Sequence, residues 1–317
     1  MQNLEDEILV SIIVLTYNHE KSVKRTLDSI LAQRTQYKYE IIIGDDASKD
    51  NTRAICEDYI SRYSQVALMP YAPNKGVVRN YVDCLRACSG KYIMGCAGDD
   101  WWHNVEKIQA QVTFLESHTS CPMVFSGCYI HNEDSNIQTL SQPSTGYYKF
   151  NSLLLNYPIS ALTICYRNYP SIREELEHVI INGWGIEDYP LALYLASQGD
   201  LYCMEGVYGT YSVIQGSISN CADIMDKERF EGKVREIRCF YAQKLDLLND
   251  DIKVKIDDVY YTSLSTIGIR YNDKKYCYQN LLKIHRKRFK EYVKIALCKV
   301  PFGFRYLRYK CRNINVI

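Results

Sequence analysis

The sequence predicts an α/β fold with a doubly wound, mostly parallel β-sheet, followed by a helical C-terminal extension. Apolar β-rich runs alternate with amphipathic helical segments at the spacing of βαβ units up to about residue 220. The opening run ILVSIIVLTYN is almost entirely apolar, which is typical of a strand buried on both faces of a parallel sheet. Beyond Ile224, long charged helical segments replace the strands.

Strands are expected where β-branched residues run together. Helices are expected where apolar residues recur every three or four positions, as Val23, Leu27 and Ile30 do. The predicted strands cover residues 8–18, 39–48, 66–71, 90–100, 122–130, 156–167 and the start of 201–219. The predicted helices cover residues 20–33, 48–63, 74–88, 104–118 and 183–200, and the polar stretch 131–148 is expected to be a loop.

Composition limits the possible classes of protein. With 317 residues, of which 47% are hydrophobic, the chain can bury one large core with a smaller appendage. The 13 cysteines are odd in number and contain no Cys-x-x-Cys pair or zinc spacing, which favours reduced thiols in a reducing compartment. The apolar run near the N-terminus follows acidic residues, and no stretch is long enough to span a membrane. We therefore expect a cytoplasmic protein.

The net charge of +1 conceals a strong asymmetry. Residues 281–317 contain eleven Lys or Arg and one acid, a charge of +10, so residues 1–280 carry −9. The basic segment also contains many Phe and Tyr residues, a composition that suits a helix on an anionic membrane. We expect peripheral association with the inner face of the cell membrane, and no nucleic-acid partner because no nucleic-acid motif is present. A solvated basic face is the alternative.

Polar residues end three of the predicted strands, in the sequences LTYN, GDDAS and AGDD. In open parallel sheets, ligands bind beyond the carboxyl ends of the strands. These polar residues are therefore expected to line a ligand site. The chain has neither a Gly-x-Gly-x-x-Gly nor a Walker loop, so the usual dinucleotide and P-loop fingerprints are absent.

Five motifs occur in an order that resembles the family 2 glycosyltransferases, which have the GT-A fold. They are SIIVLTYN, EIIIGDDASKDNT, NKGVVRN, GKYIMGCAGDD and WGIEDYPLALYLASQG. The resemblance covers roughly residues 9–220. It implies a catalytic domain at 1–222, with a nucleotide-sugar half at about 1–100 and an acceptor half at about 101–222. Residues 223–317 then form a helical basic region.

The acid pair Asp99 and Asp100 matches the family's metal-binding motif. A divalent cation between carboxylates and a diphosphate stabilises the charge that develops on the leaving group. Mn²⁺ or Mg²⁺ suits oxygen ligands. The family's usual first acid is replaced by Ala97, so the resemblance assigns the metal to Asp99 and Asp100, and Asp99 also to the donor diphosphate. A solvated pair that caps the following helix is the alternative.

The resemblance also places the donor nucleoside at the ends of the first two strands. Asp46 matches the residue that accepts the imide hydrogen of uracil, and Thr16 and Tyr17 lie where a ring can stack on the base. Arg79, after the NKG turn, is a candidate for a phosphate or ribose contact. The alternatives are helix capping for Asp46, ordinary packing for Tyr17 and an ion pair for Arg79.

A second acid pair, Glu187 and Asp188, matches the family's catalytic helix start. An inverting transferase needs a base that takes the proton of the acceptor hydroxyl as it attacks the anomeric carbon. The resemblance implies that Asp188 is this base and that Glu187 assists it. Favourable placement of acids at a helix N-terminus is the alternative.

The chain departs from the family pattern where an Arg-x-His often follows a tyrosine. Ser212 and Ile214 fill those two places in TYSVIQ. The three histidines His19, His103 and His131 are expected to be surface or capping residues. Trp101 and Trp102 are candidates for the wall of a sugar pocket, with core packing as the alternative.

The resemblance to family 2 glycosyltransferases implies a metal-dependent, inverting hexosyl- or N-acetylhexosaminyltransferase. It would move a sugar from a nucleotide donor, a UDP-sugar, to a saccharide or lipid-linked saccharide acceptor in polysaccharide biosynthesis. The alternatives are a sugar-phosphate nucleotidyltransferase and a non-catalytic nucleotide- or glycan-binding protein. The first of these alternatives lacks support, because LTYNHEKS does not resemble a basic phosphate loop.

Overall fold

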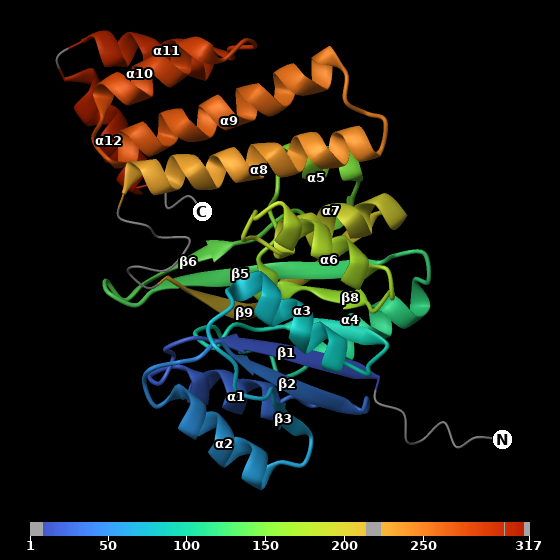
Figure 1. Ribbon diagram of the computed structural model, residues 1–317. Coiled ribbons are helices and arrows are strands. Elements are labelled where there is room, and N and C mark those ends of the chain that lie inside the picture. Colours follow the sequence, from blue (N-terminus) through green and yellow to red (C-terminus); the bar gives the residue numbers. More distant parts are fainter. Residues whose placement is uncertain (1–8, 214–222, 301, 314–317) are drawn as a thin grey trace. The chain divides into compact units, whose positions relative to one another are not determined.

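The computed structural model describes residues 9–213, 223–300 and 302–313. The chain forms two compact units, Met1–Val213 and Ile214–Ile317 (Figure 1). The boundary that the sequence predicts near residue 222 lies outside the described residues. Each unit is described by itself.

The first unit is built on a single mixed sheet. Among the described residues, nine strands join in the order β3-β2-β1-β4-β8-β5-β9-β7, and β6 pairs with β5. The strands are β1 (Val10–Thr16), β2 (Tyr39–Asp45), β3 (Val66–Leu68), β4 (Tyr92–Gly95), β5 (Met123–Asn132), β6 (Ile137–Ser141), β7 (Gly146–Tyr148), β8 (Cys165–Arg167) and β9 (Leu201–Val213). The α/β fold class predicted from the sequence is confirmed.

Strand directions place most carboxyl ends at one edge of this sheet. Strands β1 to β4 are mutually parallel, and β9 is parallel to β5. The short strand β8 is antiparallel to both β4 and β5, so β5 and β9 run in the same direction as β4. The ends of β1, β2, β4, β5 and β9 therefore lie at a common edge, called here the carboxyl edge.

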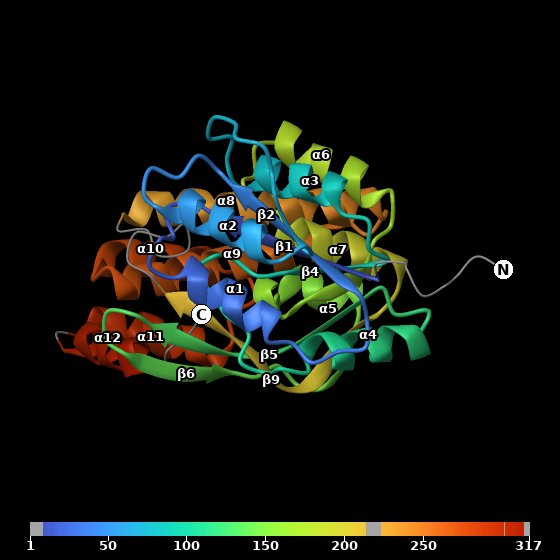
Figure 2. The same cartoon turned by 90° about the horizontal axis from the view of Figure 1, so that it is seen from below.

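Helices cover both faces of the sheet, as Figure 2 shows for α3 and α6 on one side and α1 and α4 on the other. The central strand β1 is buried on both faces, since consecutive residues from Val10 to Val14 are almost fully covered. The helices of this unit are α1 (Val23–Leu31), α2 (Thr52–Arg62), α3 (Val77–Ala87), α4 (Lys107–Ser117), α5 (Phe150–Leu155), α6 (Ile172–Ile181) and α7 (Asp188–Gln198), with a 3₁₀ turn at Ala161–Thr163.

Two sequence expectations for this unit were wrong. The predicted loop at 131–148 contains β6 and β7, whose exposed and polar positions hide the strand pattern. The predicted strand at 156–167 is mostly irregular, and only β8 is extended. After β8, helix α6 lies against α3 and α7.

The second unit is entirely helical in the residues that the structure describes. Its helices are α8 (Ile224–Lys244), α9 (Asp250–Arg270), α10 (Lys274–Lys283), α11 (Phe289–Lys299) and α12 (Gly303–Asn313). The side chains of Asp223, Asn249 and Asp273 accept hydrogen bonds from the backbone at the starts of α8, α9 and α10. A compact apolar cluster joins the last helices of this unit: Ile269, Cys277, Leu281, Ile284, Cys298, Phe304 and Leu307.

Two further observations concern the cysteines and the length of the helices. The twelve cysteines that the structure describes are all free thiols, and most are buried. None of the described helices is both long and apolar enough to cross a membrane.

Candidate active site

The ends of β1, β2 and β4 meet at the carboxyl edge of the sheet. Thr16 pairs with Asp45 in the β1–β2 register, and the backbone N–H of Asp46 donates to the Thr16 carbonyl at 3.0 Å. After β4 the chain continues beside β1, because the Gly98 N–H donates to the Leu15 carbonyl at 2.8 Å. The predicted site residues of three strands are thereby neighbours.

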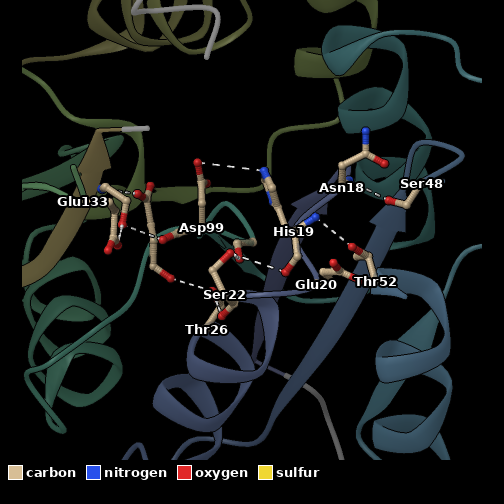
Figure 3. Close-up of polar contacts among 12 residues, drawn as sticks. Asn18, His19, Glu20, Ser22, Thr26, Ser48, Thr52, Asp99 and Glu133 are labelled. Atoms are coloured by element: carbon tan, nitrogen blue, oxygen red, sulfur yellow. Dashed lines mark hydrogen bonds and ion pairs between the residues drawn. The ribbon is translucent and has the colours of Figure 1, made fainter. Parts of the chain in front are cut away.

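Asp99 lies at this edge with its carboxylate only partly covered. Its Oδ2 is 3.9 Å from Nε2 of His19, and its side chain is 18% exposed (Figure 3). His19 projects from the loop after β1 toward Asp99 (Figure 3). The histidine expected to be a surface or capping residue is therefore a neighbour of the predicted metal ligand.

Two buried polar atoms near Asp99 have no hydrogen-bond partner among the described residues. They are Oγ1 of Thr16 and Nδ1 of His19. Both lie against the bare α-carbon of Gly98, since a Cβ added there would be 2.8 Å from each atom. Buried polar atoms without partners are rare in proteins, and a bound ligand or water is a common reason for them.

Arg25 of α1 joins the segment Asp99–Trp101 to the far half of the sheet. Its Nη2 donates to the Asp99 carbonyl at 3.1 Å, to Glu133 Oε1 at 2.9 Å and to Ser212 Oγ at 3.3 Å. Its guanidinium also stacks over the Trp101 ring. No sequence motif points to this role, because Arg25 lies outside the matched motifs in an ordinary amphipathic helix.

Asp100 differs from Asp99 in its environment. It is 3% exposed, its Oδ1 accepts the backbone N–H of Ser212 at 2.8 Å, and its carbonyl accepts the Thr26 hydroxyl at 2.6 Å. Burial, and after it the Asp99 charge, raise the pKa of Asp100 well above its ordinary value. This acid joins β4 to β9, so the two members of the predicted metal pair are unequal in exposure.

The residues present fit a divalent cation in one particular way. Within the described ranges, no group of three or more His, Cys, Asp and Glu has an arrangement that could hold a metal ion by itself. Mg²⁺ and Mn²⁺ are often held by one or two carboxylates together with substrate phosphates. The carboxylate of Asp99, beside the unpartnered atoms of Thr16 and His19, fits a cation that arrives with a diphosphate.

The nucleoside candidates have partners of their own. Both carboxylate oxygens of Asp46 accept backbone N–H groups of the NKG turn, from Lys75 at 2.8 Å and Gly76 at 2.9 Å. The neighbouring Asp45 carboxylate is bonded to Ser48 and lies 3.8 Å from Arg53. Asp46 therefore shapes the turn that begins α3. The imide N–H of a nucleobase would have to donate to the remaining lone pairs of the Asp46 carboxylate.

Tyr17 and Arg79 are more accessible than the acids. Tyr17 is 41% exposed at the end of β1, which leaves its ring free to contact a ligand. Arg79 lies in the first turn of α3, and its Nη1 is 3.9 Å from Glu177 Oε2. This loose ion pair was one of the sequence alternatives for Arg79.

The two tryptophans after the acid pair have different roles. Trp102 is 2% exposed, and its indole N–H donates to the Leu162 carbonyl at 3.1 Å, so it is a core residue. Trp101 is partly exposed and forms an isolated bridge with Thr210 of β9. Of the two, Trp101 is therefore the candidate for a pocket wall.

The second acid pair begins α7. Burial, and after it the charge of Asp188, raise the pKa of Glu187 to about 8. Burial also raises the pKa of Asp188, against hydrogen bonds from the Tyr189 N–H and the Tyr157 hydroxyl. Carboxyl groups with raised pKa values are typical of residues that exchange protons near neutral pH.

The acids of α7 begin the helix, far from the end that joins β9, and they lie near α3. Only Gly199 and Asp200 separate the end of α7 from the start of β9, so the helix ends at the edge opposite the carboxyl edge. Its first turn is about 16 Å away along the helix axis. Burial raises the pKa of Tyr81 in α3, the helix whose entry turn Asp46 binds, and the nearby charge of Glu187 raises this pKa further.

Solved structures identify the architecture as the GT-A fold. The chain resembles TarS 1-349 of S. aureus, in complex with UDP-GlcNAc, with a TM-score of 0.58 and 17% identity over 96% of this chain and 87% of that one. It also resembles the mannosyltransferase PcManGT of Pyrobaculum calidifontis, in complex with GDP-Man and Mn²⁺, with a TM-score of 0.57 and 14% identity over 96% and 84% of the two chains.

Sequence comparison then identifies the family. The model of Glycosyl transferase family 2 matches residues 11–177, and the chain belongs to that family. The uncharacterized protein Rv1520 of Mycobacterium tuberculosis is 32% identical over 182 residues, which are 55% of this chain. The chain spans about half the length of that relative, 51%. The glucosyltransferase WfgD of Escherichia coli is 25% identical over 84% of this chain and 95% of its own length.

Proposed function

We propose that this protein is an inverting, divalent-metal-dependent glycosyltransferase that uses a nucleotide sugar as donor. The observation that carries the proposal is the meeting of Thr16, Asp46 and Asp99 at the carboxyl edge, where Thr16 and His19 each have an unpartnered buried atom. Ligands of open α/β sheets bind at this position. Family membership supplies the chemical class.

The donor binds at the ends of β1, β2 and β4. Tyr17 offers an exposed ring to the base, and the turn held by Asp46 lies beside it. Arg79 can leave its loose pair with Glu177 for the donor's phosphates or ribose. Asp99 would hold Mn²⁺ or Mg²⁺, and Asp100 would hold the backbone next to Asp99 in place through its hydrogen bond with Ser212. The cation, when bound, neutralises the charge of the departing diphosphate.

The acids at the start of α7, Glu187 and Asp188, carry out the proton transfer. Asp188 takes the proton of the acceptor hydroxyl while the hydroxyl oxygen attacks the anomeric carbon. The attack comes from the face opposite the leaving diphosphate, which inverts the configuration. Tyr157 and the Tyr189 N–H hold the Asp188 carboxylate in place. The pKa of Glu187 is raised to about 8, so this carboxyl is protonated at neutral pH and the pair carries at most one negative charge.

The donor we propose is a UDP-hexose or UDP-N-acetylhexosamine, and the acceptor a saccharide or a lipid-linked saccharide in polysaccharide biosynthesis. The name of WfgD describes transfer from UDP-Glc to α-D-GlcNAc-diphosphoundecaprenol. The TarS structure contains UDP-GlcNAc. An acceptor on a lipid would bring this enzyme to a membrane surface.

A thermal-shift screen of nucleoside diphosphates and nucleotide sugars tests the proposal. A ligand that binds the folded state raises the melting temperature. UDP and a UDP-sugar are expected to raise it in the presence of Mn²⁺, and less in its absence. No shift with any nucleotide would contradict the proposal. Pyrophosphate release from a nucleoside triphosphate and a sugar-1-phosphate would instead identify a nucleotidyltransferase.

A further inference from the structure

Large apolar side chains are concentrated on the surface of the last three helices. Of the sixteen large apolar side chains that are exposed among the described residues, eight lie between Leu282 and Tyr309. They are Leu282, Phe289, Tyr292, Val293, Val300, Phe302, Tyr306 and Tyr309. Single exposed apolar residues are ordinary in proteins, but a concentration of them in one short segment marks an interaction surface.

In α11 these side chains follow the helical repeat on the outward face. Phe289 is 85% exposed, Tyr292 59% and Val293 38%, and the exposed Ala296 continues the stripe one turn later. The inward face carries Cys298, which belongs to the apolar cluster of this unit. A helix with one face in solvent usually carries polar residues on that face. The outward face of α11 instead carries apolar residues.

The short helix α12 likewise has one face in the apolar cluster and an outward face with exposed aromatic side chains. Phe304 and Leu307 enter the apolar cluster to which α11 contributes Cys298. Phe302, before the helix, is 73% exposed, and Tyr306 and Tyr309 are 50% and 65% exposed. Both helices therefore turn an aromatic stripe away from one shared core. These outward residues of 282–310, with their cations, are called here the basic aromatic surface.

The charged residues of this segment are nearly all basic, although Arg286 pairs with Asp251 of α9. Between residues 282 and 317 the sequence has one acid, Glu291, and it is 1% exposed because it caps the start of α11. Lys299, Arg305 and Lys310 have no carboxylate partner within the described part of the chain. Arg305 lies 5.8 Å from the Phe302 ring and Lys310 lies 5.9 Å from the Tyr306 ring, so cations and aromatics alternate.

We infer that the basic aromatic surface binds the headgroup layer of an anionic phospholipid bilayer. Lysine and arginine side chains are attracted to anionic headgroups, and aromatic and aliphatic side chains insert at the boundary with the acyl chains. The aliphatic members Leu282, Val293 and Val300 favour a bilayer over single-stranded nucleic acid, which would need stacking rings and cations alone. The inference is independent of the transfer chemistry, because it concerns the second compact unit by itself.

Vesicle co-sedimentation with the full chain tests the inference. The protein is expected to bind vesicles of phosphatidylcholine that contain phosphatidylglycerol, and to bind pure phosphatidylcholine at least about tenfold more weakly. The triple variant Phe289→Ser, Tyr292→Ser and Phe302→Ser is expected to lower binding to the anionic vesicles by about tenfold or more. The charge-reversal variant Lys299→Glu, Arg305→Glu and Lys310→Glu should lose it as well.

The matched control is Ile181→Ser, which removes a side chain that is 77% exposed in α6 of the first unit. This control should bind anionic vesicles like the wild type, and all variants should keep the helical circular dichroism and the UDP-dependent thermal shift. Retention of vesicle binding by the triple aromatic variant would overturn the inference. So would tighter binding to single-stranded polyuridine than to anionic vesicles, which would assign the surface to nucleic acid. A protein that binds vesicles but not UDP would refute the proposed function alone.

Discussion

The guanidinium carbon of Arg25 lies 3.7 Å from the centroid of the Trp101 ring. From this stacked position the same side chain donates to the Asp99 carbonyl and to the Glu133 carboxylate. Arg25 thereby contacts the residues on both sides of Asp100, the backbone of Asp99 and the ring of Trp101, and links them to Glu133 after β5 and to Ser212 of β9. Ser212, one of the two residues that stand where the family often has Arg-x-His, donates its hydroxyl to the same Asp99 carbonyl at 2.7 Å.

Replacement of Arg25 by Ala is expected to loosen Asp99. Loss of charge-assisted hydrogen bonds of this kind lowers the free energy of unfolding by about 1–3 kcal/mol. The Mn²⁺ concentration that gives half-maximal transfer should rise about tenfold, because the metal ligand is less well placed. A metal titration of the transfer rate at saturating donor measures this effect.

Arg62→Ala is the matched control for Arg25→Ala. Arg62 also lies over an aromatic ring, at 4.6 Å from the Tyr59 centroid, and pairs with Asp58, but it belongs to the exposed side of α2. Exposed pairs of this kind contribute about 0–1 kcal/mol. An equal rise in the metal requirement in both variants would show that Arg25 does not position Asp99.

Gly98 has room for hydrogen alone. A Cβ at this position would be 2.8 Å from both Thr16 Oγ1 and His19 Nδ1 and 3.0 Å from Thr16 Cβ. We expect Gly98→Ala to displace Asp99 and abolish most of the transfer activity, with a loss of about 1–3 kcal/mol of stability from overpacking. Initial rates and a urea unfolding curve measure the two effects.

The control for Gly98→Ala is Gly95→Ala, three residues earlier. A Cβ at Gly95 meets nothing within 4 Å, so this variant should remain active and stable. If Gly98→Ala kept the wild-type rate and the wild-type metal requirement, the close approach of Gly98 to Thr16 and His19 would have no part in holding Asp99.

The half-buried carboxyl of Glu187 gives the free energy of unfolding a definite pH dependence. Its pKa is raised from 4.5 in the unfolded chain to about 8 in the folded protein. Between these two pH values the folded state holds a proton that the unfolded state has lost. The contribution of Glu187 to the free energy of unfolding is therefore complete below the lower pKa and disappears as the pH rises through the upper pKa. The slope for one such group is about 1.4 kcal/mol per pH unit.

Glu187→Gln is expected to remove this dependence. The free energy of unfolding of the wild type should fall more steeply than that of the variant between pH 5 and about pH 8, as urea unfolding at each pH would measure. The variant should consequently be the more stable protein at the alkaline end. Parallel stability profiles for the two proteins would mean that Glu187 titrates normally.

Much of the first unit could be predicted because each strand and helix has a local signal. The apolar run of β1 and the spacing of Val23, Leu27 and Ile30 in α1 require no knowledge of distant residues. Strands β6 and β7 were missed because they are polar, short and largely exposed, and only their pairing with β5 and β9 makes them strands.

The candidate site shows the same division between local and distant causes. Motif order led to Asp99, Asp46 and Asp188, because strand ends and helix starts are local features. The partners Arg25 and Glu133 come from an amphipathic helix and an exposed strand end, and they meet Asp99 only through the fold. The unequal burial of Asp99 and Asp100 could not be predicted from two adjacent identical residues.

Asp188→Asn tests the assignment of the base most directly. The amide keeps the size of the side chain and still accepts the Tyr189 N–H through its oxygen, but it cannot take a proton. Loss of a general base lowers the rate by about 10²- to 10⁴-fold. Transfer should therefore fall to the limit of detection while the UDP-dependent thermal shift stays close to that of the wild type, because the donor binds at the strand ends.

Asp200→Asn is the control for Asp188→Asn, since it makes the same chemical change at the exposed far end of α7. It should leave both the rate and the thermal shift unchanged. Loss of UDP binding together with transfer in Asp188→Asn would assign Asp188 a structural role at the start of α7. Full activity in that variant would move the base to another residue, and Glu187, the other carboxyl at the start of this helix, would be the next to be replaced.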